Sequence, residues 1–392
     1  MKATTPIVVF LLFIVVTSTD ALCGTKPRIV NLTSSALPYE LGREIGEKCK
    51  SEIERRLSYS DEDATYARRL VAKSDSLKAL VTSWKAIHKE SFPDAVSELS
   101  GISAGSGVSM DDLFVQQTYV ELLLYHYHKL SSSSSSSSIT DGHCTDVMMF
   151  AKEGKKLVHG HNDDWTCELA PDMVILQTAS WTAYTHPASL VGGAFVVNRW
   201  GLSFGVNTAY PLDSGGGTFS SAFILRSLID SKNIGEVLAR LPKYPVRGGF
   251  VLDVSSACER RAASIEVYGA TFSVRSISWK SRGASLVHTN TYDSLNVDRW
   301  ESAYAKRHRD CAKTATFLNV TDVRRFLGDS TDCPVFETDI DKSETMATLI
   351  ADADLKTLTV YTNPNIIDDD RPLVLPWNFV CDTLSKTNKN AG

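Results

Sequence analysis

The sequence has no basic tract, no second long apolar run and no Cys-x-x-Cys pair, and each absence removes a class of protein. Its 392 residues carry 41 Lys+Arg against 46 Asp+Glu, so the net charge of −5 gives no electrostatic support for nucleic-acid binding. No segment after the N-terminus is apolar enough to span a bilayer. Scattered cysteines argue against zinc ribbons and thioredoxin-like redox sites. The 43% hydrophobic content is that of a globular protein with an ample core.

The N-terminus has the features of a secretory signal peptide. Lys2 precedes an apolar run from Ile7 to Val16, which is too short to span a bilayer, and Thr19 and Ala21 supply small residues before a cleavage site. We therefore predict a cleaved signal peptide over residues 1–21. The mature protein is expected to be secreted or lysosomal, with no membrane attachment after signal removal.

The cysteines and two sequons fit the same compartment. Eight cysteines are typical of an oxidising environment, and if one thiol is functional the other seven cannot all pair, so a second free thiol is expected. The sequons at Asn31 and Asn319 predict N-glycosylation.

The chain changes character once. Apolar residues recur at helical spacing from Pro38 to about Leu130, with a glycine-rich turn expected at 101–107. Eight serines at 131–138 predict an exposed linker, and strand patterns with blocks of helix follow. This order predicts an α+β fold of layered sheets covered by helices.

A cysteine stands directly behind the serine linker, at the start of the first strand. If the chain is cut between His143 and Cys144, one residue gains both a thiol and a free α-amine. An α-amine with an ordinary pKa of about 7.7–8.0 can serve as general base for its own thiol. The structural alternative is a buried or disulfide-bonded cysteine.

The hairpin that follows brings an acidic residue toward this cysteine. With the turn centred on Gly154, Cys144 and Asp164 are equally far from the centre, so antiparallel pairing predicts that they face each other. Asp164 would then bind the α-ammonium or orient the nucleophile. Its structural alternative is a turn residue.

A metal site is the rival interpretation of the same segment. His159, His161 and Asp163 form a His-x-His-x-Asp pattern, as in binuclear zinc hydrolases, and histidines two apart on a strand share a face. A third histidine would have to come from His186, His288 or His308, none of which has a supporting pattern.

Several short motifs together resemble one family, the cysteine-nucleophile Ntn (N-terminal nucleophile) hydrolases typified by acyl-coenzyme A:isopenicillin-N acyltransferase, which include insect N-β-alanyl-amine hydrolases. The resemblance runs from about Pro38 to Asn363. The motifs that carry it are Pro38-Tyr-Glu-Leu-Gly-Arg-Glu-Ile-Gly46, Glu98-Leu-Ser-Gly-Ile-Ser-Ala-Gly-Ser-Gly-Val108, Asp141-Gly-His-Cys-Thr145, Gly160-His-Asn-Asp-Asp-Trp165 and Val287-His-Thr-Asn290.

The resemblance implies an αββα sandwich formed by a self-cleaving precursor. It implies that Cys144 is the nucleophile, that Asp164 supports the active site, and that Asn290 donates to the oxyanion. Two departures stand out: His143 replaces the glycine that the family usually has before the cysteine, and the segment ending at Glu337 lacks an arginine that the penicillin-type acyltransferase has there.

From the sequence we predict a secreted amidohydrolase that cleaves a small N-acyl amine or amino acid conjugate through a Cys144 thioester, without a cofactor or metal ion. A helical α-chain (22–143) and a β-chain (144–392) would assemble as one structural domain. The alternatives are an acyltransferase of the same fold, a zinc hydrolase at His159, His161 and Asp163, and a non-enzymatic glycosylated binding protein.

Overall fold

The computed structural model describes residues 24–34, 37–59, 63–130, 143–151, 156–213, 215–281, 283–339, 343–364, 366–369 and 371–381. The helices are α1 (Pro38–Lys48), α2 (Lys50–Ser58), α3 (Asp63–Lys73), α4 (Asp75–Ser91), α5 (Pro93–Ser106), α6 (Met110–Leu130), η1 (Cys167–Asp172), α7 (Ser221–Leu228), α8 (Ile234–Arg240), η2 (Leu241–Lys243), α9 (Ala303–Thr314) and α10 (Val320–Leu327). None of the described helices combines the length and apolarity that a bilayer span requires.

The strands form two sheets. The first sheet has the order β1-β4-β5-β6-β7-β8-β9-β10, with β12 beside β7, and the second has the order β11-β2-β3-β14-β15-β16, with β13 beside β14. Their bounds are β1 (Arg28–Asn31), β2 (His143–Phe150), β3 (Leu157–Trp165), β4 (Val174–Gln177), β5 (Trp181–Thr185), β6 (Phe195–Asn198), β7 (Leu202–Pro211), β8 (Gly249–Ser256), β9 (Arg261–Tyr268), β10 (Thr271–Ser278), β11 (Ser285–Thr289), β12 (Arg299–Trp300), β13 (Thr338–Asp339), β14 (Ser343–Asp352), β15 (Thr357–Tyr361) and β16 (Leu373–Pro376). Apart from the parallel pair β1–β4, the paired strands are antiparallel.

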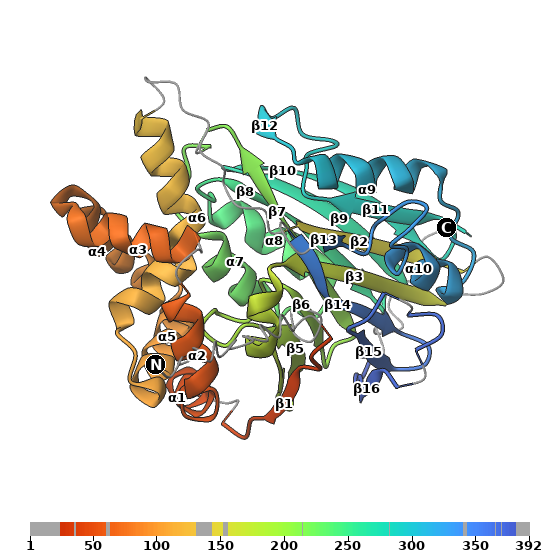
Figure 1. Ribbon diagram of the computed structural model, residues 1–392, viewed down its shortest axis with the longest axis horizontal. Coiled ribbons are helices and arrows are strands. Elements are labelled where there is room, and N and C mark those ends of the chain that lie inside the picture. Colours follow the sequence, from red (N-terminus) through yellow and green to blue (C-terminus); the bar gives the residue numbers. More distant parts are fainter. Residues whose placement is uncertain are drawn as a thin grey trace, which may run out of the picture.

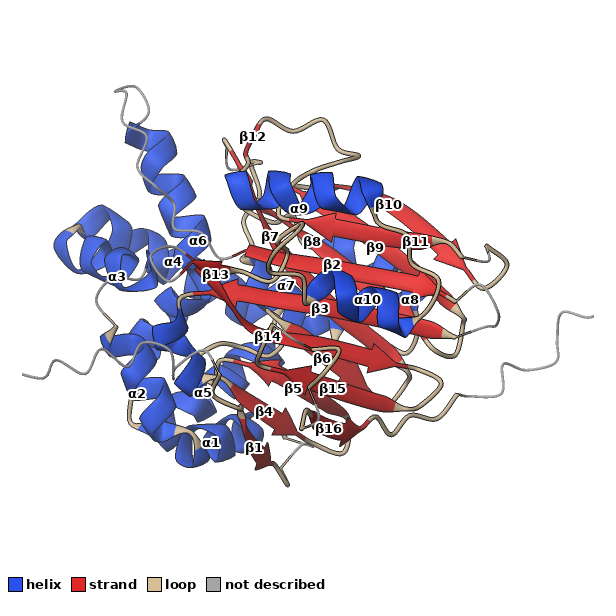
Figure 2. Cartoon of the chain, turned by 45° about the vertical axis from the view of Figure 1, so that its right-hand side comes forward, coloured by secondary structure: helices blue, strands red, loops and turns tan. Residues whose placement is uncertain are grey.

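Three apolar cores separate four layers. One core joins helices α1–α8 to the outer face of the first sheet, a second lies between the sheets, and a third joins the second sheet to α9 and α10. Figures 1 and 2 show α9 and α10 lying across β2, β3 and β11, with α1–α6 gathered at one end of the strands. The layer order is helix, sheet, sheet, helix, which confirms the predicted αββα sandwich.

Strand β2 shows why the sequence pattern of this region is nearly all apolar. Met148 and Phe150 point into the core between the sheets, whereas Val147 and Met149 point toward α9 and α10. Because both faces of the strand are buried, its apolar residues run without the polar alternation of a surface strand.

The expected glycine-rich turn at 101–107 is wrong for most of its length. Residues 101–106 complete α5, and only Gly107, at φ 79°, ends the helix in the left-handed conformation. A Cβ on Gly101 would lie 2.1 Å from the backbone oxygen of Tyr39, and one on Gly42 would lie 1.9 Å from that of Glu98. These glycines let α1 and α5 pack backbone to backbone, which explains glycine inside a helix despite its low propensity.

The described cysteines agree with the expectation of a second free thiol. Cys258 pairs with Cys381, Cys311 pairs with Cys333, and Cys167 is also disulfide-bonded. Among the described cysteines, Cys49 and Cys144 are free. The predicted signal peptide and serine linker lie outside the described residues.

Both predicted glycosylation sites are exposed asparagines. Asn31 lies in β1, and Asn319 caps α10 by accepting hydrogen bonds from the backbone N–H groups of Thr321 and Asp322. Glycosylation at either position stays a prediction.

Candidate active site

Cys144 is the second residue of β2, and the strands on both sides of β2 supply its neighbours. Strand β11 pairs with β2 so that Thr289 lies opposite Thr145, which brings the next residue, Asn290, to Cys144. The Asn290 Oδ1 accepts a hydrogen bond from the backbone N–H of Cys144 at 2.7 Å. Its Nδ2 donates to the carbonyl oxygen of Thr208 in β7 at 2.9 Å, so Asn290 spans the two sheets.

The predicted pairing of Cys144 with Asp164 is wrong by one residue. Asp163 lies opposite Cys144, and Asp164 lies opposite His143. The reason is the even loop length: Phe150 pairs with Leu157, so the hairpin is centred between residues 153 and 154 rather than on Gly154. A slip of one residue moves a side chain to the other face of the sheet. Asp163 therefore shares the face of Cys144, and Asp164 does not.

On the inner face of the second sheet, the buried carboxylate of Asp146 lies two residues along β2 from Cys144. Asp146 accepts hydrogen bonds from His159 Nε2 at 2.8 Å and from Nδ1 of His161 at 2.9 Å. Across the gap, Nδ2 of Asn207 in β7 donates to the same carboxylate at 2.8 Å. This network links the two sheets beneath Cys144.

The two histidines set the ionisation of Asp146. Burial alone would favour the neutral acid, but His161 and His159 hold the pKa of Asp146 below its usual range. Burial also opposes the charge of His161, yet the Asp146 carboxylate outweighs it and raises the pKa of His161. Asp146 and His161 therefore favour each other's charged forms beside Cys144.

A close approach makes this network possible. A Cβ on Gly205 of β7 would lie 2.0 Å from Oδ1 of Asp146. Any residue larger than glycine at position 205 would displace that carboxylate from the histidines.

The outer face of the same strands carries a second polar network. Thr145 Oγ1 and His308 Nδ1 lie 2.7 Å apart, and Nε2 of His308 lies 2.6 Å from Oε1 of Glu337. The Glu337 N–H donates to Oγ1 of Thr345, which in turn donates to Oδ1 of Asp164 at 2.6 Å. Asp164 is thus connected through Thr345 and Glu337 to α9.

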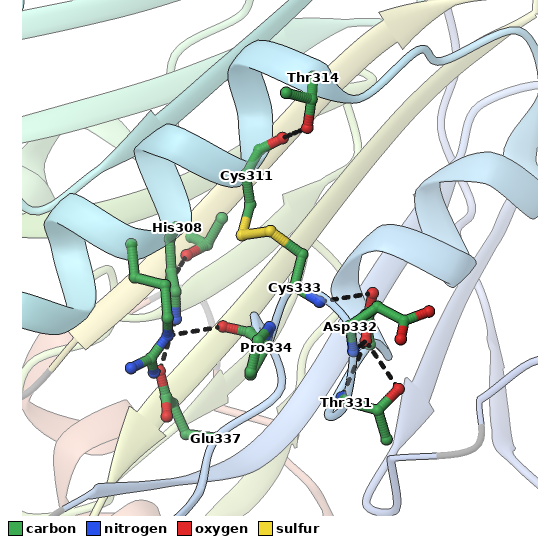
Figure 3. The surroundings of a disulfide bond; sticks show 11 residues. His308, Cys311, Thr314, Thr331, Asp332, Cys333, Pro334 and Glu337 are labelled. Carbon is green, nitrogen blue, oxygen red and sulfur yellow. Dashed lines mark hydrogen bonds and ion pairs between the residues drawn. A yellow bond between two sulfur atoms is a disulfide. The ribbon is translucent and has the colours of Figure 1, made fainter.

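A disulfide holds this outer network in place. Figure 3 shows the Cys311–Cys333 bond joining α9 to the segment that precedes β13, with Glu337 beside His308. Arg307 donates to the carbonyl oxygen of Pro334 at 3.1 Å and pairs with Glu337. The segment that lacks the family's arginine therefore lies against an arginine of α9.

His143 fits into the outer layer rather than into solvent. Its Nδ1 lies 3.2 Å from Oγ of Ser302, and its ring packs on Tyr304 with ring centroids 5.1 Å apart. Burial, together with the charges of His308 and Arg307, lowers the pKa of His143 to about 3. The residue that replaces the expected glycine is consequently neutral at physiological pH and held against α9.

Acidic side chains surround Cys144, and burial raises the pKa of both Asp163 and Asp164. Burial raises the pKa of the Cys144 thiol well above the usual value, and Asp163, Asp164 and Asp146 raise it further, against one opposing hydrogen bond from the Asp164 backbone. The protonated thiol is therefore favoured over the thiolate. A positive charge placed at this point would be stabilised by the same carboxylates.

A cavity of about 170 Å³ opens beside Asp163 and extends between α6, α7 and the first sheet. Its lining is mainly apolar, including Trp165, Leu225 and Phe250, with the ionisable side chains of Arg56, Glu121 and Asp163 among the exceptions. Thr208, which holds Asn290, lies on its wall. Small-molecule sites are commonly of this kind, with few polar groups in an apolar hollow.

The metal site of the rival interpretation, at His159, His161 and Asp163, is not assembled with His159 as a free ligand. Both ring nitrogens of His159 are already bonded, Nδ1 to Ser203 and Nε2 to Asp146. Among the described residues, the groups able to hold a metal ion are Cys144, His161 and Asp163, and separately Glu266, His288 and Asp293. Compared with the expected set of His159, His161 and Asp163, the first group contains Cys144 in place of His159.

Sequence reasoning missed several residues of the site. Asp146 is two residues from Cys144 on a strand, so the period of two could have placed it on the same face. His308, Glu337 and Asn207 come from distant elements and carry no local signal. Glu121 and Arg56 of the cavity lie on helices expected only to form the core.

A strand-borne cysteine whose backbone nitrogen meets an asparagine amide, set in an αββα sandwich, defines the class of cysteine Ntn hydrolases and acyltransferases. The chain belongs to the acyl-coenzyme A:6-aminopenicillanic acid acyl-transferase family, whose model matches residues 150–365, more than half of its length. That match includes Asp164 and Asn290 and begins just after Cys144.

The solved structures that resemble the chain include a mutant form of conjugated bile acid hydrolase from Clostridium perfringens. It shares 9% sequence identity, with 60% of this chain and 92% of that chain covered and a TM-score of 0.37. No curated protein sequence matches the chain.

Proposed function

We propose that the protein is a secreted or lysosomal cysteine amidohydrolase that matures by cutting its own chain between His143 and Cys144. Its substrate would be a small N-acyl amine or amino acid conjugate. The observation that carries the proposal is the 2.7 Å contact from the backbone nitrogen of Cys144 to the Asn290 Oδ1. That nitrogen is the atom that becomes an α-amine after cleavage, and a hydrogen-bond acceptor already faces it.

Maturation would use the chain's own thiol. The Cys144 Sγ attacks the carbonyl carbon of His143, the bond to the Cys144 nitrogen breaks, and that nitrogen takes the thiol proton. Water then hydrolyses the resulting thioester to a His143 carboxylate and a free Cys144 thiol. The carboxylates of Asp163, Asp164 and Asp146, which disfavour a thiolate in the uncut chain, would stabilise the α-ammonium.

Catalysis would repeat this chemistry on a substrate amide. The α-amine takes the thiol proton, Sγ attacks the acyl carbon, and the proton passes to the departing amine. Water resolves the acyl-thioester and frees the acid. Asn290 is proposed to stabilise the oxyanion, because its amide has a second N–H besides the one directed at Thr208.

The size and lining of the cavity support a small, partly apolar substrate. Its apolar walls suit a hydrocarbon or aromatic portion, and Arg56 and Glu121 offer opposite charges for a polar end. Asp163 belongs both to this lining and to the face of Cys144, which places the cavity beside the proposed nucleophile.

Acyl transfer is the second candidate, and the family match favours it. An amine in place of water would then resolve the thioester. Against it stands the proposed secretion, because acyl-coenzyme A is mainly intracellular. The zinc-hydrolase alternative has lost His159 as a ligand, and the binding-protein alternative expected Cys144 in a disulfide, whereas this thiol is free.

The test is intact mass measurement with N-terminal sequencing of the purified secreted protein, beside Cys144→Ala and Cys144→Ser. Wild type should yield a fragment that begins at Cys144, and neither variant should be cut at a comparable rate. If both variants are cut like wild type, an external protease is responsible. A panel of N-acyl compounds, each with and without an added amine acceptor, then separates hydrolysis from transfer.

A further inference from the structure

Cys144 shares its face of β2 and β3 with two other metal-binding side chains. Each of Cys144, His161 and Asp163 offers one ligand atom, and the three atoms lie within 4.8 Å of one another. All three residues project between the sheets, because Asp163 pairs directly with Cys144 and His161 is two positions before Asp163 in β3. A modest inward movement would bring them to zinc-bonding distance.

Two of these side chains have buried polar atoms without a hydrogen-bond partner among the described residues. These atoms are Nε2 of His161 and Oδ2 of Asp163. His161 is fully buried and Asp163 is 6% exposed. Buried polar atoms of this kind are costly unless something binds them. Since Asp146 holds the Nδ1 of His161, the free nitrogen is the one that a metal would use.

The residues behind this group are arranged as in metal sites. The Asp146 carboxylate fixes the ring of His161 at 2.9 Å and is itself held by His159 and Asn207. Burial raises the pKa of Asp163, and the hydroxyl of Tyr184 opposes this shift. Histidine ligands usually donate their second ring nitrogen to a carboxylate in this way.

In the second candidate group, Glu266, His288 and Asp293, potential ligand atoms are already engaged in hydrogen bonds. Both oxygens of Glu266 accept backbone N–H groups of residues 293–295, and His288 Nε2 is directed at Glu266. Its donor atoms are already used to hold the segment that follows Asn290.

We propose that Cys144, His161 and Asp163 form an inhibitory zinc site, in which the metal binds the nucleophile and blocks it. A thiolate, an imidazole and a carboxylate form a donor set that suits zinc better than magnesium or calcium. On binding, Zn–S, Zn–N and Zn–O bonds form in place of bonds from zinc to water. The thiol proton and any proton on Nε2 of His161 leave to solvent, and no redox change occurs. The zinc site itself stands on geometry alone, whereas its inhibitory effect rests on the proposed function.

The inhibitory site and the zinc-hydrolase alternative predict opposite responses to a chelator. In a zinc hydrolase, removing the metal abolishes activity. In the site proposed here, removing the metal frees the thiol, so a chelator should raise amidase activity and added zinc should lower it.

The experiment measures metal binding directly on the purified full chain. Iodoacetamide labelling is followed at Cys144 and Cys49 by peptide mass, with and without added zinc. Zinc should protect Cys144. Cys49, which is fully buried, is an internal control for the intact fold, because its labelling should stay low with and without zinc. Cobalt(II) should give a thiolate-to-cobalt charge-transfer band that zinc displaces.

Variants then identify the ligands. His161→Gln and Asp163→Asn should each weaken zinc protection at least about tenfold. Asp332→Asn is the control, since it removes an exposed carboxylate that belongs to neither network of the site and should keep protection. Unfolding midpoints of each variant report whether the fold is intact.

Zinc that leaves Cys144 labelling unchanged in wild type overturns the site without any variant. Protection that survives in both His161→Gln and Asp163→Asn also overturns it. The proposed function is tested separately. A protein that binds zinc at Cys144 but neither cuts itself nor hydrolyses any N-acyl compound would support the zinc site and contradict the proposed amidase function.

Discussion

Glu121 on α6 is a buried acid whose charge should cost the protein stability. The residue is 2% exposed, and its Oε1 accepts hydrogen bonds from the backbone N–H and the hydroxyl of Ser221 at the start of α7. Burial outweighs these hydrogen bonds and raises the pKa of Glu121 to about 7 from 4.5. We expect Glu121→Gln, which keeps the size and the acceptor oxygen, to stabilise the protein at alkaline pH.

The magnitude follows from linkage between ionisation and folding. An acid whose pKa is raised by folding adds stability below its unfolded pKa, and this stability is lost as the pH rises through the folded pKa. Each tenfold change in proton affinity corresponds to about 1.4 kcal/mol, so the loss from pH 4.5 to pH 8 amounts to about 3 kcal/mol. Glutamine cannot ionise and escapes this loss.

The assay is urea unfolding of wild type and Glu121→Gln at pH 4.5 and pH 8. At pH 4.5 the two free energies of unfolding should differ little, and at pH 8 the variant should be more stable by about 3 kcal/mol. Glu54→Gln, an exposed position on α2, is the control and should behave like wild type at both pH values. A difference between Glu121→Gln and wild type that is the same at both pH values would refute the reasoning.

Three further predictions concern the site. In the matured enzyme, Asn290→Ala should lower kcat by about 10²–10³ with little change in KM, measured by steady-state kinetics, and full activity would remove Asn290 from the oxyanion site. Asp164→Asn should slow self-cleavage, followed as the intact mass over time, because Asp164 lies opposite His143; cleavage at the wild-type rate would contradict this. Gly205→Ala should cost at least about 3 kcal/mol of unfolding free energy, because its Cβ displaces Asp146 from the two histidines. The control, Gly193→Ala, adds a Cβ with no described atom within 4 Å and should cost far less. Equal losses in the two variants would be evidence against the network.

The change from helical to strand periodicity was visible in the sequence because it depends on local pattern. The long helices of residues 38–130 and the hairpin of β2 and β3 have clear periods, and most buried strands are continuous apolar runs. Strands β1, β12 and β13 are too short to show a period, since they have four, two and two residues. The pattern at Gly101 and Gly105 predicted a turn. These glycines instead allow backbone contact between two helices, and such a tertiary contact leaves no signal in the local sequence.

The candidate site was predictable only in part, for a similar reason. Cys144 stood out by its place behind the serine linker, and Asn290 was found through family resemblance rather than through spacing. The residue opposite Cys144 depends on whether the hairpin loop has an odd or an even number of residues. The hydrophobic pattern does not show this number, because both faces of the two strands are buried. His308 and Glu337 reach Thr145 through contacts across more than 160 residues, for which the sequence has no local signal.

The segments before and after the proposed cleavage point pack into one core, so the matured protein should be handled as two associated fragments. Strand β1 pairs with β4, and Gln117 of α6 bonds to the backbone of Ala188 and Leu190, so segments before and after residue 143 share a sheet edge and a buried contact. The cavity beside Asp163 likewise takes Arg56 and Glu121 from one segment and Leu225 and Phe250 from the other. Cutting one peptide bond removes none of these contacts, so the fragments should stay together under native conditions. A β-chain expressed alone would expose the apolar face that α1–α6 cover and would lack a quarter of the residues that line the cavity, so activity assays of pre-cut protein require both segments in the same preparation.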